Sequence, residues 1–223
     1  MNNTALITGT SRGLGLQLAN TLLAAGWNVI GLSRSCTIIH TNYSHYNIDI
    51  SNFEQLLEVF KNISGTKVDL LVNNAALFTN CPFADTSVND IASIIGTNVI
   101  GTMMVTHHSI KLLVDGSTII FINSVAGLND LIGQSVYCAS KHAITSFAGV
   151  LGQELRGKKI RVSSIHPGGI NTTLWNSTNP YSVGDVQDAM PISDVVDVIK
   201  MIIDSNRKID FKTVTMFPLI EWH

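Results

Sequence analysis

The chain has 223 residues, of which 14 are basic and 16 acidic, and its formal net charge is -2. Hydrophobic residues make up 45% of the sequence and charged residues only 13%, so the chain can bury a sizeable core and lacks the high charge of disordered proteins. The balanced charges form no basic stripe and no acidic tail, which excludes extensive binding to a nucleic-acid backbone.

The sequence also argues against a metal site, an exported protein and a membrane span. Cys36, Cys81 and Cys138 lie far apart, without a Cys-x-x-Cys pair or a cysteine–histidine cluster of zinc-ligand spacing. We therefore expect no metal and a reduced, cytoplasmic protein. The strand-like run at residues 4–8 starts without the basic and apolar stretches of a secretory signal. The most apolar region, residues 91–105, is interrupted by small polar residues and is expected to be too short to cross a membrane.

Apolar strand-like runs alternate along the chain with segments of helical periodicity. Strands are expected at residues 5–8, 28–32, 45–48, 70–73, 118–123, 161–166 and 214–217. Helices are expected at about 13–25, 53–63, 88–114, 136–156 and 193–205. The run at 119–122 is apolar on both faces, which is typical of the middle of a parallel sheet. The alternation predicts a single α/β domain over residues 1–223, in which helices cover both faces of a doubly wound, seven-stranded, mostly parallel sheet.

Three glycines follow the first strand with the spacing Gly-x-x-x-Gly-x-Gly and lead into a helix. Glycines allow a tight turn and a close approach of the backbone to a pyrophosphate, which the free N–H groups at the helix start would bind. A glycine-rich turn without a ligand is the alternative, and the strand before and the helix after favour a dinucleotide. The residues predicted to bind it here are Gly9, Ser11, Arg12, Gly13, Leu14 and Gly15.

The end of the second strand indicates which dinucleotide binds. An NAD site usually has an acidic residue about twenty positions after the glycines, which binds the ribose 2′-hydroxyl, but Ser33 and Arg34 stand there. Together with Arg12, Arg34 would suit a 2′-phosphate, although each arginine could instead be a solvated surface charge. Asp49, after the third strand, could accept from the adenine amino group or cap the helix that begins near Ser51.

Three residues near the middle of the chain carry a catalytic pattern. Ser124 follows the fifth strand, and Tyr137 and Lys141 lie four positions apart on one face of the next helix. A nearby ammonium is expected to lower the tyrosine pKa toward neutrality, so that Tyr137 can exchange a proton with a substrate oxygen. Ser124 can hydrogen-bond the same oxygen. The alternative is that an isolated Tyr-x-x-x-Lys pair is only the surface of an amphipathic helix.

Together these motifs resemble the short-chain dehydrogenase/reductase family over nearly the whole chain. The residues that carry the resemblance are Thr8, Gly9, Gly13, Gly15, Asn73, Asn74, Ala75, Ala76, Asn98, Ser124, Tyr137, Lys141, Pro167 and Gly168. The resemblance implies a Rossmann-type fold in which Tyr137 is the catalytic acid or base. It also implies that Lys141 holds the nicotinamide ribose and tunes Tyr137, and that Ser124 polarises the substrate carbonyl. Asn98 would hold a water that links Lys141 to solvent.

Further cofactor contacts are implied by the same resemblance. They are Asn74, Ala75 and Ala76 on the ribose side, Pro167, Gly168 and Ile170 at the nicotinamide end, and Thr172 near the carboxamide or phosphates. The predicted cofactor contacts also include Ser33, Arg34, Asp49, Ile50, Tyr137 and Lys141. Two features depart from the family. Ala76 replaces the usual glycine, and the substrate lid at about 170–192 is short and rich in Asn, Ser and Thr.

The resemblance implies an enzyme that transfers a hydride between NADP(H) and a carbonyl/alcohol substrate, and the expected direction is ketone or aldehyde reduction. The alternatives are an NAD-dependent alcohol or sugar dehydrogenase on the same fold and, as a minor one, a non-catalytic dinucleotide sensor. The expected partners are a small-molecule substrate and further copies of the chain, in a homodimer or homotetramer. A mostly apolar set of residues hints at an uncharged substrate: Leu77, Phe78, Leu128, Ile132, Leu174 and Trp175.

Several other reactive side chains are expected to have packing roles. His107 and His108 lie in the middle of a helix, where packing or an interface is favoured over a ligand. His166 precedes Pro167 at a strand end, and a half-buried strand histidine is favoured over one that faces the cofactor. Cys138 adjoins Tyr137 but is expected to point about 100° away from it around the helix.

Overall fold

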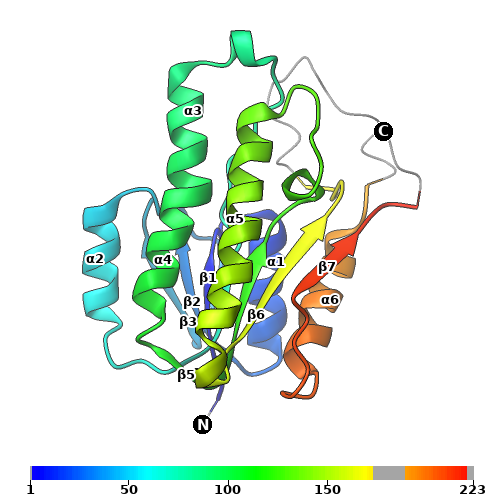
Figure 1. The fold of residues 1–223 in the computed structure, drawn as a ribbon. Coiled ribbons are helices and arrows are strands. Elements are labelled where there is room, and N and C mark those ends of the chain that lie inside the picture. Colours follow the sequence, from blue (N-terminus) through cyan, green and yellow to red (C-terminus); the bar gives the residue numbers. More distant parts are fainter. Residues whose placement is uncertain (1, 173–188, 220–223) are drawn as a thin grey trace.

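The computed structural model describes residues 2–172 and 189–219, and its centre is a sheet in which every paired strand runs parallel to its neighbour (Figure 1). The strand order of this seven-stranded sheet is β3-β2-β1-β4-β5-β6-β7. The strands are β1 (Thr4–Thr8), β2 (Asn28–Ser33), β3 (Tyr43–Asn47), β4 (Val68–Asn73), β5 (Leu113–Ile122), β6 (Arg161–Pro167) and β7 (Thr213–Met216). The predicted doubly wound α/β fold is confirmed, and the sheet is fully rather than mostly parallel.

Helices cover both faces of this sheet (Figure 1). They are α1 (Gly13–Ala24), α2 (Phe53–Asn62), α3 (Val88–Ile95), α4 (Thr102–Ser109), α5 (Ser135–Glu154) and α6 (Ile192–Asp204). The buried residues of α1 and α6 pack on one face, and those of α2, α4 and α5 pack on the other. Right-handed crossovers between parallel strands give this two-sided covering.

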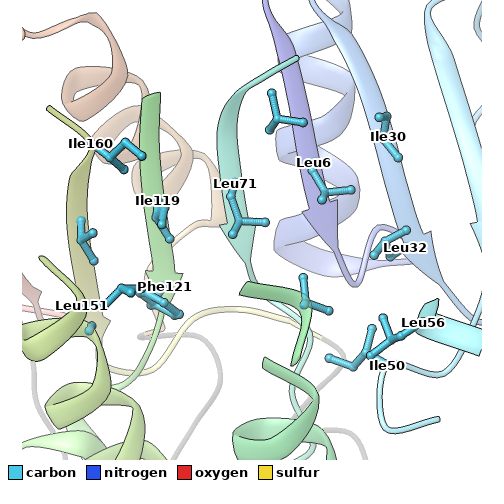
Figure 2. Packing of buried hydrophobic residues seen from close by; sticks show 14 of the residues in the cluster. Leu6, Ile30, Leu32, Ile50, Leu56, Leu71, Ile119, Phe121, Leu151 and Ile160 are labelled. Carbon is cyan, nitrogen blue, oxygen red and sulfur yellow. The ribbon is translucent and has the colours of Figure 1, made fainter. Parts of the chain in front are cut away.

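The core follows from the alternation of side chains along each central strand. In β5, Ile119 and Phe121 point to the face covered by α5, whereas Ile120 points to the face covered by α1 and α6. Figure 2 shows Ile119 and Phe121 beside Leu71 of β4 and Leu6 of β1, in one continuous layer. Since successive side chains of a strand face opposite sides, a strand buried on both faces must be apolar throughout.

Two predicted boundaries were wrong. The helix predicted at 88–114 ends at Ser109, and β5 begins at Leu113, because Leu113 pairs with Val68 of β4 and the strand then passes an irregularity before Thr118. The third strand begins at Tyr43, because Tyr43 pairs with Val29 of β2. In both places short apolar or mixed runs do not distinguish helix, strand and loop, and pairing with a distant strand decides.

Helices α3 and α4 join through a π-helical turn, Gly96–Gly101, into one helix that spans Val88–Ser109. This helix of 22 residues has the length and hydropathy of a membrane span, so the expectation that the region is too short was wrong. In the structure α4 packs against α2 and β4, and α3 against α5. Because a core helix of a globular domain passes the same hydropathy test, the finding is weak support for a span.

Candidate active site

A cleft of about 560 Å³ opens at the carboxyl ends of the strands, where ligands bind in doubly wound sheets. Its volume is in the range of small-molecule sites. All the predicted site residues lie along it except Gly15 and Asn98. The predicted residues that line it are Gly9, Ser11, Arg12, Gly13, Leu14, Ser33, Arg34, Asp49, Ile50, Asn74, Ala75, Ala76, Ser124, Tyr137, Lys141, Pro167, Gly168, Ile170 and Thr172.

The shape of the glycine loop depends on two glycines with left-handed backbone conformations and on the close approach of Gly15 to the Gly9 carbonyl. Gly9 and Gly13 have φ values of 75° and 58°, which other residues adopt at a cost. A Cβ atom on Gly9 would lie 2.8 Å from Asn74 Nδ2, and one on Gly15 would overlap the Gly9 carbonyl. Gly15 therefore lets α1 approach the loop, and its role is in packing rather than in lining the cleft.

The start of α1 is suited to a phosphate group. Arg12 is the N-cap residue, its side chain makes no capping hydrogen bond, and the first turn contains no acidic residue. The first N–H groups of a helix have no intrahelical acceptors, and the helix dipole makes this end positive. Because Gly13 and Leu14 line the cleft, these donors are available to an anion there. The local geometry fits the pyrophosphate of a dinucleotide.

Thr8, which was part of the family pattern but not a predicted contact, ties the loops after β1 and β4 together. Its Oγ1 accepts hydrogen bonds from the N–H groups of Asn74 (2.9 Å) and Ala75 (3.0 Å). Asn74 Nδ2 in turn donates to the carbonyl of Thr8 (2.9 Å) and, at 3.3 Å, to that of Gly9. These four bonds fix one wall of the cleft against the glycine loop.

Two exposed arginines stand near the glycine loop, Arg12 within the loop and Arg34 directly after β2. Arg12 and Arg34 both line the cleft, and neither forms an ion pair within the described residues. The Ser33 hydroxyl is engaged within the protein, and the predicted contact of Ser33 with the cofactor stays a prediction. It is buried, donates to the Ser35 carbonyl (2.8 Å) and lies 3.1 Å from both Thr10 Oγ1 and His45 Nε2. Its one O–H is therefore used within the protein.

Asp49 forms a local turn and does not cap α2. Its Oδ1 accepts from Ser51 N–H (2.9 Å) and Ser51 Oγ (2.7 Å), whereas the cap of α2 is Asn52, whose side chain accepts from Gln55 N–H. The capping alternative was thus wrong. Burial alone would raise the pKa of Asp49, but the bonds from Ser51 and the charge of Arg34 lower it below its usual value. An ionised acceptor therefore stays beside the cleft.

Tyr137 and Lys141 are both buried on α5, with exposed fractions of 7% and 4%. Lys141 Nζ donates to the Ile122 carbonyl at 3.1 Å and lies 5.5 Å from the centre of the Tyr137 ring. Burial raises the pKa of Tyr137 to about 12, although a hydrogen bond with Ser124 opposes the shift. Burial lowers the pKa of Lys141 to about 8. The expectation that Lys141 brings the tyrosine pKa toward neutrality was wrong for the cofactor-free protein, because desolvation of the phenol dominates.

A small apolar cluster holds the Tyr137 ring in place. The ring of Phe78 meets it edge-on, with centroids 4.8 Å apart and planes at 88°. Leu131, Ala126 and Cys138 pack in the same cluster, and Cys138, unlike Tyr137, does not line the cleft. Burial raises the pKa of the Cys138 thiol, which therefore packs as a neutral group.

Asn98 lies behind the cleft, in the π-helical turn, and is 2% exposed. Its Oδ1 accepts from Leu77 N–H (2.8 Å), and its Nδ2 donates to the Leu77 carbonyl (2.9 Å) and to Ser140 Oγ (3.1 Å). Ser140 Oγ donates to the Tyr137 carbonyl (2.7 Å). Asn98 thus connects the loop after β4 to the turn of α5 that carries Tyr137. The implied role of holding a water stays a prediction.

The substrate end of the cleft is mostly apolar, and the cleft has further lining residues beyond the predicted ones. Leu77, Phe78 and Ile132 line it, whereas Leu128 is exposed elsewhere. Leu174 and Trp175 lie outside the described residues, with most of the predicted lid. Along the whole cleft, the further lining residues are Leu32, Ile48, Thr97, Ile122, Asn123, Val125, Asp130, Leu131, Gln134, Gly169 and Pro218. Within the described part of the chain, no group of three metal-ligand side chains is close enough to hold an ion.

Comparisons with known proteins agree with this geometry. The family model described as short chain dehydrogenase matches residues 3–182. An uncharacterized short-chain type dehydrogenase/reductase of Sinorhizobium fredii is 34% identical over 178 residues, which cover 78% of this chain and 72% of that protein. Serine 3-dehydrogenase of Rhizobium radiobacter is 27% identical over 98% of this chain and 95% of its own. Carbonyl reductase family member 4 of Danio rerio is 29% identical over 78% of each chain.

Solved structures show the same fold at low sequence identity. A short chain dehydrogenase family protein from Francisella tularensis superposes with a TM-score of 0.89 at 18% identity, over 98% of both chains. The structure of ElxO with NADP bound superposes with a TM-score of 0.84 at 24% identity, over 98% of both chains.

Proposed function

The chain belongs to the short-chain dehydrogenase family, and from that premise we propose that it is an NADP(H)-dependent reductase of ketones or aldehydes. The observation that carries the proposal is the convergence of Ser124, Tyr137 and Lys141 on one cleft whose far end is the glycine loop. A phosphate-binding helix end and a proton donor within one cleft are what hydride transfer to a carbonyl requires.

When bound, the cofactor supplies the hydride that the carbonyl carbon accepts. Tyr137 gives its phenolic proton to the carbonyl oxygen, so the product is the neutral alcohol. Ser124 Oγ accepts from Ala126 N–H (3.1 Å), so its O–H, which hydrogen-bonds Tyr137 in the structure, can donate to the same oxygen when a substrate binds. Lys141, whose pKa of about 8 keeps most of it charged at neutral pH, stabilises the phenolate that remains until it is reprotonated.

The preference for NADP(H) rests on Arg12 and Arg34. Both guanidinium groups line the cleft, and no carboxylate of the described residues pairs with either. No acidic side chain stands at the end of β2, where an NAD site would bind the ribose hydroxyl. A 2′-phosphate would take charge-assisted bonds from both arginines.

Arg34→Ala is expected to lower kcat/KM with NADPH about 10- to 100-fold, because charge-assisted bonds to the phosphate are lost, while kcat/KM with NADH stays nearly constant. The measurement is steady-state reduction of a common ketone with each cofactor. Arg156→Ala is the matched control, since Arg156 is an exposed arginine in the turn after α5. An unchanged ratio of the two cofactors in Arg34→Ala contradicts the assignment and favours the NAD-dependent alternative.

The substrate end favours an uncharged carbonyl compound. Its walls include Leu77, Phe78 and Leu131, and Asp130 would repel a carboxylate. The names of relatives support both directions, since one is a carbonyl reductase and another a serine dehydrogenase. The presence of Ser124, Tyr137 and Lys141 disfavours a non-catalytic sensor.

The proposal is tested by titrating the purified protein with NADPH and NADH, followed by nicotinamide fluorescence, and then by assaying a panel of ketones and aldehydes. NADPH-preferring binding with turnover of an uncharged carbonyl is the expected result. Preference for NADH keeps the oxidoreductase and overturns the cofactor choice. Failure of both to bind overturns the proposed function.

A further inference from the structure

A buried histidine stands directly behind the catalytic serine. His166 is the penultimate residue of β6 and is fully buried, not half-buried as the sequence suggested. Its Nδ1 lies 3.0 Å from the main-chain oxygen of Ser124. The two residues are far apart in sequence, and the β5–β6 pairing brings them together: Asn123 N–H donates to the Ile165 carbonyl (2.8 Å) just after β5 ends.

The Ser124 carbonyl is held from two sides. Gly127 N–H donates to it at 2.9 Å from the following turn, and His166 Nδ1 approaches it from β6. A carbonyl oxygen has two lone pairs, so both are used. The main chain at Ser124 is extended, with φ -164° and ψ 159°, and its orientation sets the direction of the hydroxyl that faces Tyr137.

The geometry fixes the protonation state of the imidazole. A carbonyl only accepts hydrogen bonds, so Nδ1 must carry the proton and donate it. Nε2 is buried and has no partner among the described residues. Burial lowers the pKa of His166, and the charges of Lys141 and His142 on the adjacent face of α5 lower it further, against the opposing bond to Ser124. A neutral ring with one proton on Nδ1 is the consistent state.

We infer that His166 is a positioning residue for the reaction: as a neutral Nδ1–H donor, it orients the Ser124 main chain so that the serine hydroxyl reaches the oxygen that Tyr137 protonates. The inference rests on the proposed function for its catalytic consequence. An apolar side chain at this buried position would leave no nitrogen without a hydrogen-bond partner. Histidine leaves Nε2 without one among the described residues, and this cost is accepted because Nδ1 donates to the Ser124 carbonyl.

The first test needs no substrate. In nuclear magnetic resonance spectra of protein with isotope-labelled histidine, the His166 signals are assigned by their loss in His166→Asn. They are expected to report a neutral ring protonated on Nδ1 from about pH 5 to pH 8. A proton on Nε2, or titration within this range, overturns the inference.

The second test compares two variants. Asparagine at this position can still donate an N–H to the Ser124 carbonyl, whereas leucine cannot. His166→Leu is expected to lower kcat about 10- to 100-fold, as for a slightly misplaced catalytic group, with the affinity for NADPH unchanged. His166→Asn is expected to keep most of the turnover. Equal losses in both variants, or none in His166→Leu, overturn the inference.

The outcomes separate this inference from the proposed function. If the wild type reduces none of the ketones and aldehydes, the proposed function fails, and a crystal structure of His166→Leu decides the positioning. A displaced Ser124 hydroxyl supports it, and an unmoved one overturns it. If His166→Leu does not fold, the tautomer of the wild-type ring still gives the answer.

Discussion

Tyr137→Phe is expected to bind NADPH as the wild type does and to reduce carbonyl substrates at least about a thousandfold more slowly, since loss of a positioned proton donor typically removes a factor of this order. The phenol is the acid in the proposed reaction, and phenylalanine keeps the ring that packs against Phe78 while it removes the O–H. The measurement is kcat for reduction of one carbonyl compound at saturating NADPH, and nicotinamide fluorescence reports the binding of NADPH.

The pKa of Tyr137 also predicts how the rates of reduction and oxidation depend on pH. Because burial raises this pKa to about 12 in the cofactor-free protein, the phenol is protonated across the physiological range. Reduction needs this protonated form and is expected to show no loss of rate from the titration of Tyr137 up to about pH 10. Oxidation needs the phenolate and is expected to rise with pH over the same range.

Tyr46→Phe is the control for Tyr137→Phe. Tyr46 packs against the core from β3, so removal of its hydroxyl should leave turnover unchanged. Turnover of Tyr137→Phe above a tenth of the wild-type value would show that another group protonates the substrate oxygen. Loss of NADPH binding in Tyr137→Phe would show instead that the phenol shapes the cofactor site.

The sequence was sufficient to predict those parts of the site whose residues lie close together in the chain. The glycine loop and the Tyr-x-x-x-Lys pair are each set within one turn or one helix, and their placement around one cleft follows from the parallel sheet. The doubly wound fold followed from strands that are apolar on both faces.

The remaining features depend on contacts between distant segments. The oxygen of the Ser33 hydroxyl lies within hydrogen-bond distance of Thr10 Oγ1 and His45 Nε2, which reach it from other strands and loops. The pKa of Tyr137 depends on its burial in the folded chain. His166 was interpreted as a half-buried strand residue, because no local pattern reveals that β6 places it against the Ser124 carbonyl.

Lys141→Met is expected to abolish efficient turnover and at the same time to stabilise the cofactor-free protein at neutral pH by about 2 kcal/mol. Burial lowers the pKa of Lys141 from 10.5 to about 8, and this difference corresponds to roughly 3 kcal/mol of destabilisation of the charged form. Part of the gain is offset, because methionine cannot donate to the Ile122 carbonyl as Lys141 Nζ does. Urea unfolding of both proteins measures the difference.

The pH dependence gives this prediction a distinct signature. Between pH about 8 and 10.5 the unfolded chain keeps the Lys141 proton while the folded protein has released it. The free energy of unfolding therefore rises with pH through this window for the wild type, and Lys141→Met lacks the rise. The destabilisation is fully present below about pH 8 and absent above 10.5. The high pKa of the Tyr137 phenol has the opposite effect, but only once the pH exceeds its ordinary value of 10.0.

Lys200→Met is the matched control, because Lys200 is exposed on α6 and its replacement should not change the pH dependence. The other titrating groups, including the buried thiol of Cys138, are common to all three proteins, so the difference between them isolates Lys141. If Lys141→Met is no more stable than the wild type at neutral pH, other interactions in the cofactor-free protein offset the free-energy cost of burying the ammonium. If it is more stable and inactive, the chain keeps an unfavourable buried charge because the phenolate of Tyr137 requires it during turnover.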